Sequence, residues 1–372
     1  MGAVVSIVQP YIPRYRVAFF DRLRDALAAD GITVNLVVSQ PAGAQSARGD
    51  SAEPTVDVDE VHPRTLSIGR ISFTLTNTSG FWRGADAVIL PLEGSSLDVY
   101  RAMSRRRGGL RVGLWGHVLN YVAPANILDV RLERALMRRA DQVFAYTASG
   151  ANAAVEAGVD PMKVRMLRNT IDTQALESAV RTVTKADAEA FRSRHGLRGP
   201  TFGYLGGLDA SKRIDYLAAA LEEMWSLNPA AKVIVAGHGD QAGLLNVAAS
   251  RGQVIMLGYA DARSKALIGE VSSALLMPGR IGLVAVDALT LRLPIITSEY
   301  PWHGPEREYL KDGSDVLVVS GGPRQFALAA LSSDLPKVAS AAPGLDGMVS
   351  TFADGVRALV ASKPGRSESR NN

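Results

Sequence analysis

Cysteine is absent from the 372 residues of this sequence. Its absence excludes disulfide bonds, thiolate zinc sites and thiol nucleophiles. Histidine is scarce as well, with five residues in the chain. No two of them have the spacing of metal ligands on a helix, which argues against a transition-metal site. The five are His62, His117, His195, His238 and His303.

Long apolar runs are also missing. No stretch approaches the roughly 18 consecutive apolar residues that a membrane span needs. The first residues, MGAVVSIVQP, lack the basic start and the cleavage site of a signal peptide. They match the Met-Gly-x-x-x-Ser pattern for N-myristoylation, although Gly2 leads directly into an apolar strand. We therefore expect a cytoplasmic protein, with any membrane contact limited to peripheral binding on the inner face of the cell membrane.

The charge excess is small and uneven. The chain carries 41 Lys and Arg against 37 Asp and Glu, and the net +4 belongs to residues 1–170, which hold 20 against 16. The densest run is Arg105, Arg106 and Arg107. It fits a basic face that meets an anionic membrane surface or a phosphorylated acceptor, or equally a helix end whose cations complement the dipole. Because no aromatic residues interleave with these arginines, nucleic acid is not an expected partner.

Length and patterning predict two α/β domains. A hydrophobic content of 47% with 21% charged residues is typical of globular proteins, and 372 residues suit two cores better than one. Short, almost continuously apolar segments alternate with amphipathic helical patterns, which favours parallel sheets buried on both faces. The predicted strands cover residues 4–8, 32–38, 87–90, 110–114, 142–146 and 164–167, and then 201–205, 232–236, 254–257, 274–277, 294–297 and 316–319.

We place the first domain at residues 1–171 and the second at 172–345, followed by an amphipathic helix at 346–361 and a disordered polar tail at 362–372. Residues 40–60 are rich in Gly, Ser, Ala and Asp and predict a mobile loop. The triplet Asp57-Val58-Asp59 within them is interpreted as solvated surface rather than as a metal–diphosphate site. Residues 172–200 hold one predicted helix and a connection.

The second domain is organised around residues 274–306. They predict a strand, a Pro-Gly turn, a helix over 283–291, another strand and a polar loop. In a parallel sheet such a turn and helix start lie outside the carboxyl end of the strand, where ligands bind. Free N–H groups at the helix start can donate hydrogen bonds to phosphate or to a sugar hydroxyl. Asp287, five residues after Gly282, lies on the first turns of this helix.

These segments resemble the retaining GT-B glycosyltransferases of family 4 over nearly the whole chain. The N-terminal IVQPYIPRYRVAFFDRL is similar to the opening strand, loop and helix of bacterial polysaccharide members, LWGHVLNY to their Trp-Gly-His segment and RNTIDT to their interdomain signature. GYLGGLDASKRIDYL resembles the segment that contacts the donor diphosphate, VIVAGHGDQ the Gly-x-Gly turn and HGPEREYLKDGSDVLVV the closing strand. PGRIGLVAVDALTLRLPIITSE lies where the family has its Glu-x7-Glu motif.

The resemblance has departures. The second acid of the Glu-x7-Glu motif falls on Asp287, and the first falls on Gly279, which has no side chain. The usual arginine after the glycine of the diphosphate segment falls on Gly207, so Lys212 with Arg213 would substitute for it. We hypothesise that Glu306 partly replaces the carboxylate missing at Gly279.

The family implies two Rossmann-like doubly wound domains facing across a cleft, with a C-terminal helix packing back. It implies that residues 1–171 bind the acceptor and residues 172–345 bind a nucleotide-diphosphate sugar of the UDP or GDP type. The expected reaction is metal-independent transfer of a hexosyl unit, with retention, to a saccharide or lipid-linked saccharide hydroxyl, without a separate cofactor. A nucleotide-sugar epimerase of the same fold and a non-catalytic nucleotide-sugar-binding protein remain alternatives.

Residue types and the resemblance together select the candidate site. Lys212 and Arg213 would stabilise the leaving diphosphate, Asp287 would accept bonds from ribose or sugar hydroxyls, and His117 would face the donor sugar and acceptor. Each has a plainer alternative: a solvated first-turn lysine, a dipole-complementing acid, a buried structural histidine. Donor-binding candidates are Gly206, Gly207, Gly237, Gly239, Arg280, Gly282, Leu283 and Glu306. Acceptor-binding candidates are Tyr15, Arg16 and His117, with a helix-end role as the alternative for Arg16 and a plain tight turn for the Gly237–Gly239 segment.

Overall fold

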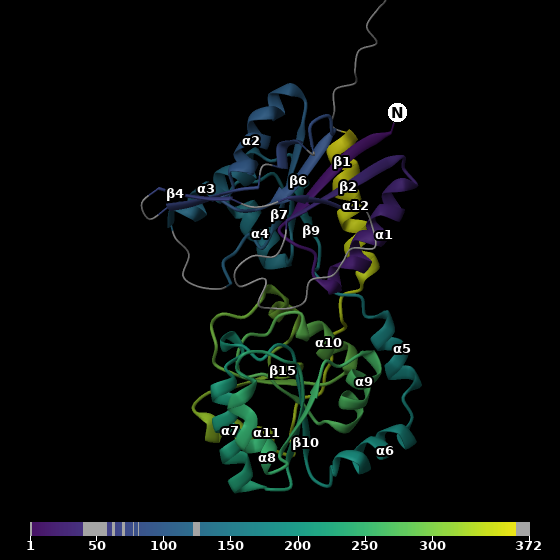
Figure 1. The fold of residues 1–372 in the computed structure, drawn as a ribbon, viewed down its shortest axis with the longest axis vertical. Coiled ribbons are helices and arrows are strands. Elements are labelled where there is room, and N and C mark those ends of the chain that lie inside the picture. Colours follow the sequence, from purple (N-terminus) through teal and green to yellow (C-terminus); the bar gives the residue numbers. More distant parts are fainter. Residues whose placement is uncertain are drawn as a thin grey trace, which may run out of the picture. The chain divides into compact units, whose positions relative to one another are not determined.

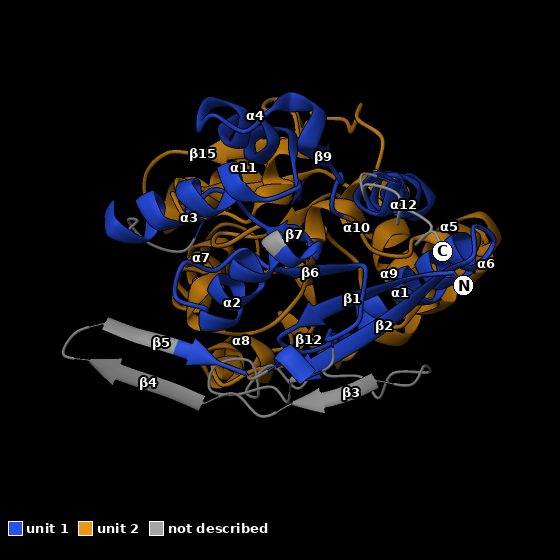
Figure 2. Cartoon of the chain, turned by 90° about the horizontal axis from the view of Figure 1, so that it is seen from above, with its two compact units in different colours: residues 1–169, 345–372 blue, residues 170–344 orange. Residues whose placement is uncertain are grey.

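The computed structural model describes residues 2–39, 58–61, 64–68, 71–76, 78–80, 82–121 and 127–361. The chain divides into two compact units, which Figure 2 colours separately. Unit 1 contains residues 1–169 and 345–372, and unit 2 contains residues 170–344. Each is built on a parallel sheet flanked by helices, so the predicted two-domain α/β fold is confirmed. Within the described part of the chain, no helix combines the length and the hydropathy needed to cross a membrane.

Unit 1 has a seven-stranded sheet in the order β3-β2-β1-β6-β7-β8-β9, in which every neighbouring pair is parallel. Its strands are almost wholly apolar because helices cover both faces. They are β1 (Ala3–Gln9), β2 (Ile32–Ser39), β3 (Val58–Val61), β6 (Ala87–Pro91), β7 (Arg111–Gly116), β8 (Gln142–Ala145) and β9 (Val164–Met166). The helices are α1 (Val17–Ala28), α2 (Leu97–Arg105), α3 (Ile127–Arg139), α4 (Ala148–Glu156) and α12 (Leu345–Ala361).

Three strands of unit 1 were not predicted. β3 pairs with β2 at the sheet edge, so the prediction of a loop over 40–60 is wrong at its end, while residues 40–57 lie outside the described part. Asp59 belongs to this strand. The strands β4 (Arg64–Ile68) and β5 (Ile71–Leu75) form a separate antiparallel hairpin. An edge strand such as VDEV has only one neighbour and needs no continuous apolar run, which is why the pattern missed it.

The C-terminal helix α12 belongs to unit 1. It packs against α1, beside which it runs in Figure 1. Phe352 is fully buried with ring centroids 5.4 Å from Phe19, 4.9 Å from Trp115 and 4.4 Å from Phe144. Aromatic contacts of this kind supply a large share of core burial. The expectation of a C-terminal helix packing back is thereby confirmed.

Unit 2 has a six-stranded sheet in the order β12-β11-β10-β13-β14-β15, again parallel throughout. Its strands are β10 (Thr201–Leu205), β11 (Lys232–Ala236), β12 (Val254–Gly258), β13 (Leu275–Leu276), β14 (Ile295–Ser298) and β15 (Val316–Val319). Its helices are α5 (Gln174–Thr182), α6 (Lys185–His195), α7 (Ile214–Leu227), α8 (Asn246–Ser250), α9 (Ala262–Val271), α10 (Val284–Leu291) and α11 (Pro323–Ala330).

Residues 172–200 contain two helices where one was predicted. The break falls at Val183, whose backbone is extended, and Thr184 begins the second helix. Thr184 and Asp187 form a reciprocal capping box, in which each side chain accepts a backbone N–H from the other residue. Such a box satisfies orphan donors at a helix start and allows a new helix to begin directly after another.

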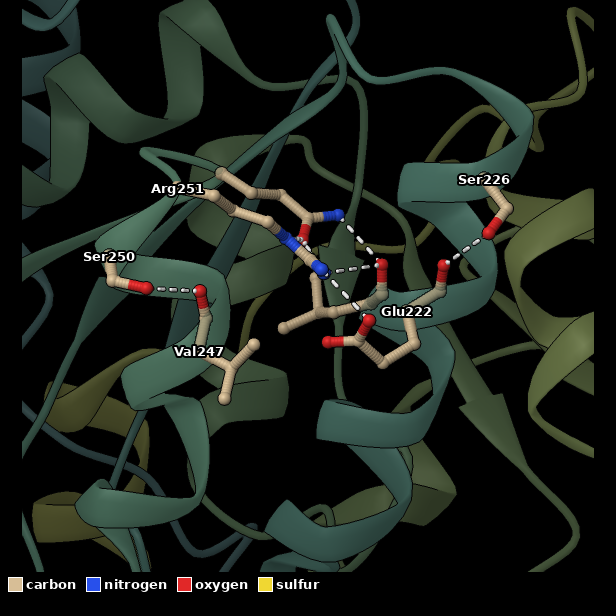
Figure 3. A network of polar contacts seen from close by, with 7 residues as sticks. Glu222, Ser226, Val247, Ser250 and Arg251 are labelled. Carbon is tan, nitrogen blue, oxygen red and sulfur yellow. Dashed lines mark hydrogen bonds and ion pairs between the residues drawn. The ribbon is translucent and has the colours of Figure 1, made fainter.

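Arg251 joins the end of α8 to α7 (Figure 3). Its guanidinium donates to the Glu222 carboxylate at 2.8 Å and to the Leu221 carbonyl at 3.3 Å, and it lies 4.8 Å from the Trp225 ring centroid. Trp225 is half-buried beneath this arginine. The fully buried position is taken by its neighbour Met224.

In both sheets, the side on which successive strands are added changes once. In unit 1 the chain winds from β1 through β2 to β3 and then returns to add β6 on the other side of β1. In unit 2 it winds from β10 to β12 and returns to add β13 beside β10. Ligands of open α/β sheets bind at such switch points, outside the carboxyl ends of the strands. The loops after β1, β6, β10 and β13 therefore define where a site can form.

Candidate functional site

Two loops meet at the switch point of unit 2. The loop after β10 ends in a short 3-10 turn, η6 (Ala210–Lys212), and Asp209 caps this turn by accepting the Ser211 N–H at 2.9 Å. The Lys212 ammonium donates to the Arg280 carbonyl at 2.7 Å, and the Arg280 N–H donates to the Ser211 carbonyl at 2.9 Å. The structure thus brings Lys212 and Arg280, both predicted site residues, to one place.

Gly279 lies at the centre of this junction. A Cβ atom at this position would be 2.6 Å from the carbonyl oxygens of Lys212 and Ser211, a separation that real Cβ atoms essentially never show. The missing first acid of the Glu-x7-Glu motif therefore has a steric cause. The backbone that carries Lys212 occupies the space into which a side chain at 279 would extend.

Two predicted donor-binding glycines lie where two loops pack closely. A Cβ on Gly237 would overlap the Gly206 carbonyl oxygen, and a Cβ on Gly239 would be 2.6 Å from the Leu208 carbonyl carbon. Their missing side chains let the loop after β11 pack on the loop after β10, and their role in donor binding stays a prediction. Gly206 itself has a φ of +136° with no neighbour within 4 Å of a Cβ, and the Gly207 carbonyl accepts a hydrogen bond from a tyrosine of β10 at 2.6 Å.

Arg213 is committed to packing. Its guanidinium donates to the Ser298 hydroxyl at 2.7 Å and lies 4.4 Å from the Tyr216 ring centroid. The Ser298 hydroxyl in turn donates to the Pro278 carbonyl at 2.5 Å. Arg213 therefore ties the start of α7 to the end of β14 and to the turn before α10, contacts that the sequence did not indicate.

His303 holds the turn before α10 from the opposite side. Its Nδ1 accepts the Ile281 N–H at 3.1 Å, which places the ring proton on Nε2. Burial, and then the positive charges of Arg307, Arg280 and Lys212, lower the pKa of His303 to about 4. The ring is neutral at physiological pH because burial, more than the neighbouring positive charges, disfavours its protonated form. In the sequence His303 lies in the polar loop that ends residues 274–306, and nothing there indicated this hydrogen bond.

The acid stability of unit 2 should depend on His303. Because the native pKa is about 4, the unfolded chain binds the proton first, and stability falls as pH drops from about 6.5 to about 4. In His303→Asn, an amide oxygen can accept the same N–H without titrating. The free energy of unfolding, measured with urea, should therefore fall less over this pH range than in the parent protein. His303→Leu leaves the Ile281 N–H unsatisfied and should cost about 1–3 kcal/mol at pH 7. Identical pH dependence in parent and Asn variant would contradict this assignment.

A buried carboxylate lies close to the turn that leads into α10. Glu306, in η8 (Pro305–Tyr309), is 4% exposed, and its Oε2 lies 3.7 Å from the position of a Cβ on Gly282. An acid is therefore present at the helix start, close to Gly282 and Leu283, although position 279 cannot hold one. This location agrees with the hypothesis that Glu306 replaces the missing acid, which stays a prediction.

Asp287 has a protein partner that was not foreseen. Both carboxylate oxygens accept hydrogen bonds from the Lys265 ammonium of α9, at 3.0 and 2.9 Å. The aspartate is 8% exposed. Asp287 thus lies on α10 as expected, but its charge is balanced by Lys265 rather than by the helix dipole alone. Lysine 22 residues earlier in the chain gave no sequence signal of this pairing.

Unit 1 has a cavity of about 510 Å³ at its switch point. It is lined by the ends of β1, β6, β7 and β8 and by one side of α3, and all three acceptor candidates border it. Tyr15 is 39% exposed there. His117 is exposed too, so the alternative of a buried structural histidine is wrong. Its ring centroid lies 4.6 Å from that of Tyr146.

A strained turn presents His117. Val118 has a φ of +63°, and the Leu119 N–H donates to the His117 carbonyl at 2.7 Å, which together define a γ-turn of the rare positive-φ kind. A β-branched residue adopts this conformation only when its surroundings impose it, and such residues cluster at functional sites. The geometry singles out the loop after β7 as a functional segment.

Arg16 is a fixed part of the cavity wall. It is 6% exposed, and its guanidinium donates to the Asn169 side-chain oxygen and to the Met348 sulfur. It also lies within 6 Å of the ring centroids of four aromatic residues. Arg16 is therefore held by the fold on nearly every side, which is more than the helix-end role that was the alternative for it.

Comparison with known proteins assigns both halves of the chain. The family Glycosyltransferase Family 4 matches residues 18–175, and the family Glycosyl transferases group 1 matches residues 199–334. Both matched families are glycosyltransferase families, and together they cover most of the chain. No curated protein matches this sequence.

Solved structures share the fold of this glycosyltransferase. HepE of Anabaena, in complex with UDP, is 14% identical with a TM-score of 0.59 over 97% of this chain and 95% of HepE. Sucrose-phosphate synthase from Thermosynechococcus elongatus is 15% identical, with a TM-score of 0.58 over 96% and 95% of the two chains. MnaA of S. aureus, in a structure with UDP, is 13% identical, with a TM-score of 0.59 over 98% and 99%. At these identities the similarity shows the fold alone.

The run Arg105, Arg106 and Arg107 makes contacts within unit 1. Arg106 forms an ion pair with Asp141 at 2.5 Å, and the Arg105 guanidinium lies 5.2 Å from the Trp82 ring centroid. The side chain of Arg107 is outside the described part. Two of the three arginines thus anchor the end of α2 on the core, as the helix-end interpretation expects.

Proposed function

We propose that this glycosyltransferase moves a hexosyl unit from a nucleotide-diphosphate sugar of the UDP or GDP type to a hydroxyl of a saccharide or lipid-linked saccharide. The observation that carries the proposal is the junction of Lys212 with Arg280 at the unit 2 switch point, directly before α10. Two cations beside a helix start are groups that suit a diphosphate. The UDP in the HepE structure agrees with such a donor.

The proposed reaction needs stabilisation of the leaving group more than a protein nucleophile. The bond between the anomeric carbon and the diphosphate oxygen breaks, the acceptor oxygen bonds to that carbon, and the acceptor proton passes to the diphosphate. Lys212, the Arg280 side chain and the backbone at Gly282 and Leu283 would neutralise the developing negative charge. Charge neutralisation by these groups makes a divalent metal unnecessary in this proposal, and attack on the face that the diphosphate leaves gives retention.

The remaining candidates hold the substrates. Asp287, held in place by Lys265, would accept hydrogen bonds from ribose or sugar hydroxyls. His117, Tyr15 and Arg16 border the unit 1 cavity, where the acceptor would bind. A lipid-linked acceptor would bring the protein to the inner face of the membrane as a peripheral protein.

Two measurements test the proposal. A thermal-shift panel of UDP, GDP and ADP should raise the melting temperature with one base preferred, because a ligand that binds only the folded state stabilises it. Incubation with the matching nucleotide sugar and excess EDTA should then release the nucleoside diphosphate slowly. An epimerase would instead change the sugar, and a binding protein would do neither. Absence of stabilisation by every nucleoside diphosphate would overturn the proposal.

The role of Glu306 can be tested by Glu306→Gln, which keeps the size and a hydrogen-bond acceptor but removes the charge. If this carboxylate substitutes for the missing acid, donor hydrolysis should slow by about tenfold or more, while UDP affinity changes little. The exposed Glu308 of the same 3-10 turn provides the matched control, because Glu308→Gln should leave turnover unchanged. Unaltered turnover in the Glu306 variant would show that the carboxylate only supports the loop.

A further inference from the structure

The unit 1 cavity has an acidic wall. Glu93 follows β6, and Asp129 and Glu133 project from successive turns of α3, all three bordering the cavity. Burial, and then the charges of Asp129 and Glu93, raise the pKa of Glu133, which agrees with the place of the three carboxyls on one cavity wall. Glu93 remains accessible to solvent, yet the surrounding protein is dense enough that burial raises the pKa of its carboxyl.

Among the described residues that line the cavity, none is a Lys or Arg paired with these carboxylates. Arg16 is the one Lys or Arg among the described residues that line it, and its guanidinium is already engaged by Asn169, Met348 and aromatic rings. The Glu133 carboxylate accepts the Gly94 N–H, a neutral partner. The cavity therefore carries a net negative charge, although the first half of the sequence is basic.

The other surfaces of the cavity suit a sugar. Tyr11, Tyr15, Tyr146 and His117 line the cavity, and aromatic and polar side chains of these types are common in small-molecule sites. Trp115 lines the cavity as well, and among the described residues none accepts its buried indole N–H. A hydroxyl-rich ligand has acceptors of the kind this N–H lacks. Carboxylates at the opposite wall can accept from hydroxyls or, more strongly, from an ammonium group.

An inorganic cation is a poorer match than an organic one. Within the described ranges, no three His, Cys, Asp or Glu side chains lie together in a way that could hold a metal ion. The three acids are thus spread along a wall rather than gathered around a point, which suits a ligand of sugar size in a volume of about 510 Å³.

We propose that the unit 1 cavity binds the end of a saccharide that carries a free, protonated amine, with the ammonium on the wall of Glu93, Asp129 and Glu133. The proposal rests on the proposed function, since it defines the acceptor of that reaction. It excludes acceptors with a uronic acid or a phosphate on the bound sugar, because these would add negative charge beside three carboxylates. The phosphorylated acceptor that the basic first half suggested does not fit this cavity.

The test compares glucosamine, glucose and glucuronic acid as probes of the full-length protein, using saturation-transfer NMR titrations. We expect glucosamine to bind about tenfold more tightly than glucose, as a charge-assisted hydrogen bond in a recessed site predicts, and glucuronic acid to bind more weakly than both. N-acetylglucosamine, which has no charge on nitrogen, should behave like glucose. Binding of glucuronic acid as tight as that of glucosamine would overturn the proposal.

Two variants test whether the acidic wall binds the ammonium group. Glu93→Gln and Glu133→Gln should each lower glucosamine affinity about three- to tenfold and leave glucose affinity unchanged, since an amide oxygen still accepts a neutral donor. Glu156→Gln, an exposed carboxylate of α4 outside the cavity, is the matched control and should change neither affinity. Melting temperatures confirm that each variant is folded. An unaltered preference for the amine in both cavity variants would place the ammonium elsewhere and refute the assignment.

The same samples separate this inference from the proposed function. UDP binding and donor hydrolysis depend on residues of unit 2. They do not depend on which monosaccharide occupies the unit 1 cavity. Loss of UDP binding would remove the transferase assignment while leaving the order of sugar affinities to be judged by itself. Normal UDP binding with no preference among the sugars would refute only the acceptor inference.

Discussion

Replacing Lys212 by methionine is expected to lower the rate of donor hydrolysis and of transfer by about 10²–10³-fold, the usual cost of removing one positioned group that stabilises developing charge. The ammonium is held at 2.7 Å from the Arg280 carbonyl, so its place at the junction is fixed before any ligand binds. Methionine keeps the length and most of the volume of lysine, which confines the change to charge and hydrogen bonding. The rate should fall in kcat, because the charge develops in the transition state.

The control is Lys311→Met, which removes an exposed lysine of unit 2 that follows η8. It should leave kcat and UDP affinity unchanged. A rate lowered by about 10²–10³-fold, with a melting temperature near that of the parent, would confirm a role in catalysis. A rate within threefold of the parent would refute it, and a large drop in melting temperature would show instead that Lys212 mainly joins the two loops.

Restoring a side chain at Gly279 should damage the protein rather than repair the Glu-x7-Glu motif. In Gly279→Ala the new Cβ would lie 2.6 Å from two backbone carbonyl oxygens, neither of which belongs to a flexible side chain. We expect a loss of about 1–3 kcal/mol in the free energy of unfolding, as for other overpacked sites. UDP affinity should fall as well, because relief of the overlap displaces the backbone of Ser211 and Lys212.

Gly243→Ala makes the control for this experiment. Its Cβ would approach only the Asn246 side chain, at 3.9 Å, and the loss of backbone freedom in the unfolded chain is the same as for Gly279→Ala. The difference between the two variants in urea unfolding therefore isolates the steric overlap. Equal stability would mean that the loops separate without cost, and Gly279→Glu should then be tested for higher activity.

The sequence was sufficient for the sheet cores and insufficient for the contacts between loops. Apolar segments such as Thr201–Leu205 and Lys232–Ala236 were predicted at their observed bounds, because a strand buried on both faces leaves a clear pattern. Edge strand β3, paired on one side, left none. Residue type and position after a strand were enough to place Lys212 and Gly282 at the switch point.

What could not be predicted was which groups meet across long separations in the chain. The overlap of Gly279 with the backbone of Lys212, the Lys265 partner of Asp287 and the acid wall of unit 1 all join different elements. A glycine pattern does not say whether ligand or protein approaches it, and at Gly237 and Gly239 the structure shows a close approach of protein backbone. Charge totals also mislead, since the basic half of the chain contains an acidic cavity.

The place of α12 sets an order of events on the ribosome. Most of unit 1 is synthesised first, but its core lacks Phe352 and the rest of that helix until residues 345–361 emerge. Unit 2, residues 170–344, is contiguous and can complete its sheet before then. Domains usually mature from the N-terminus onward. This nascent chain should do the reverse, with unit 1 incomplete and exposed to chaperones until α12 has been synthesised.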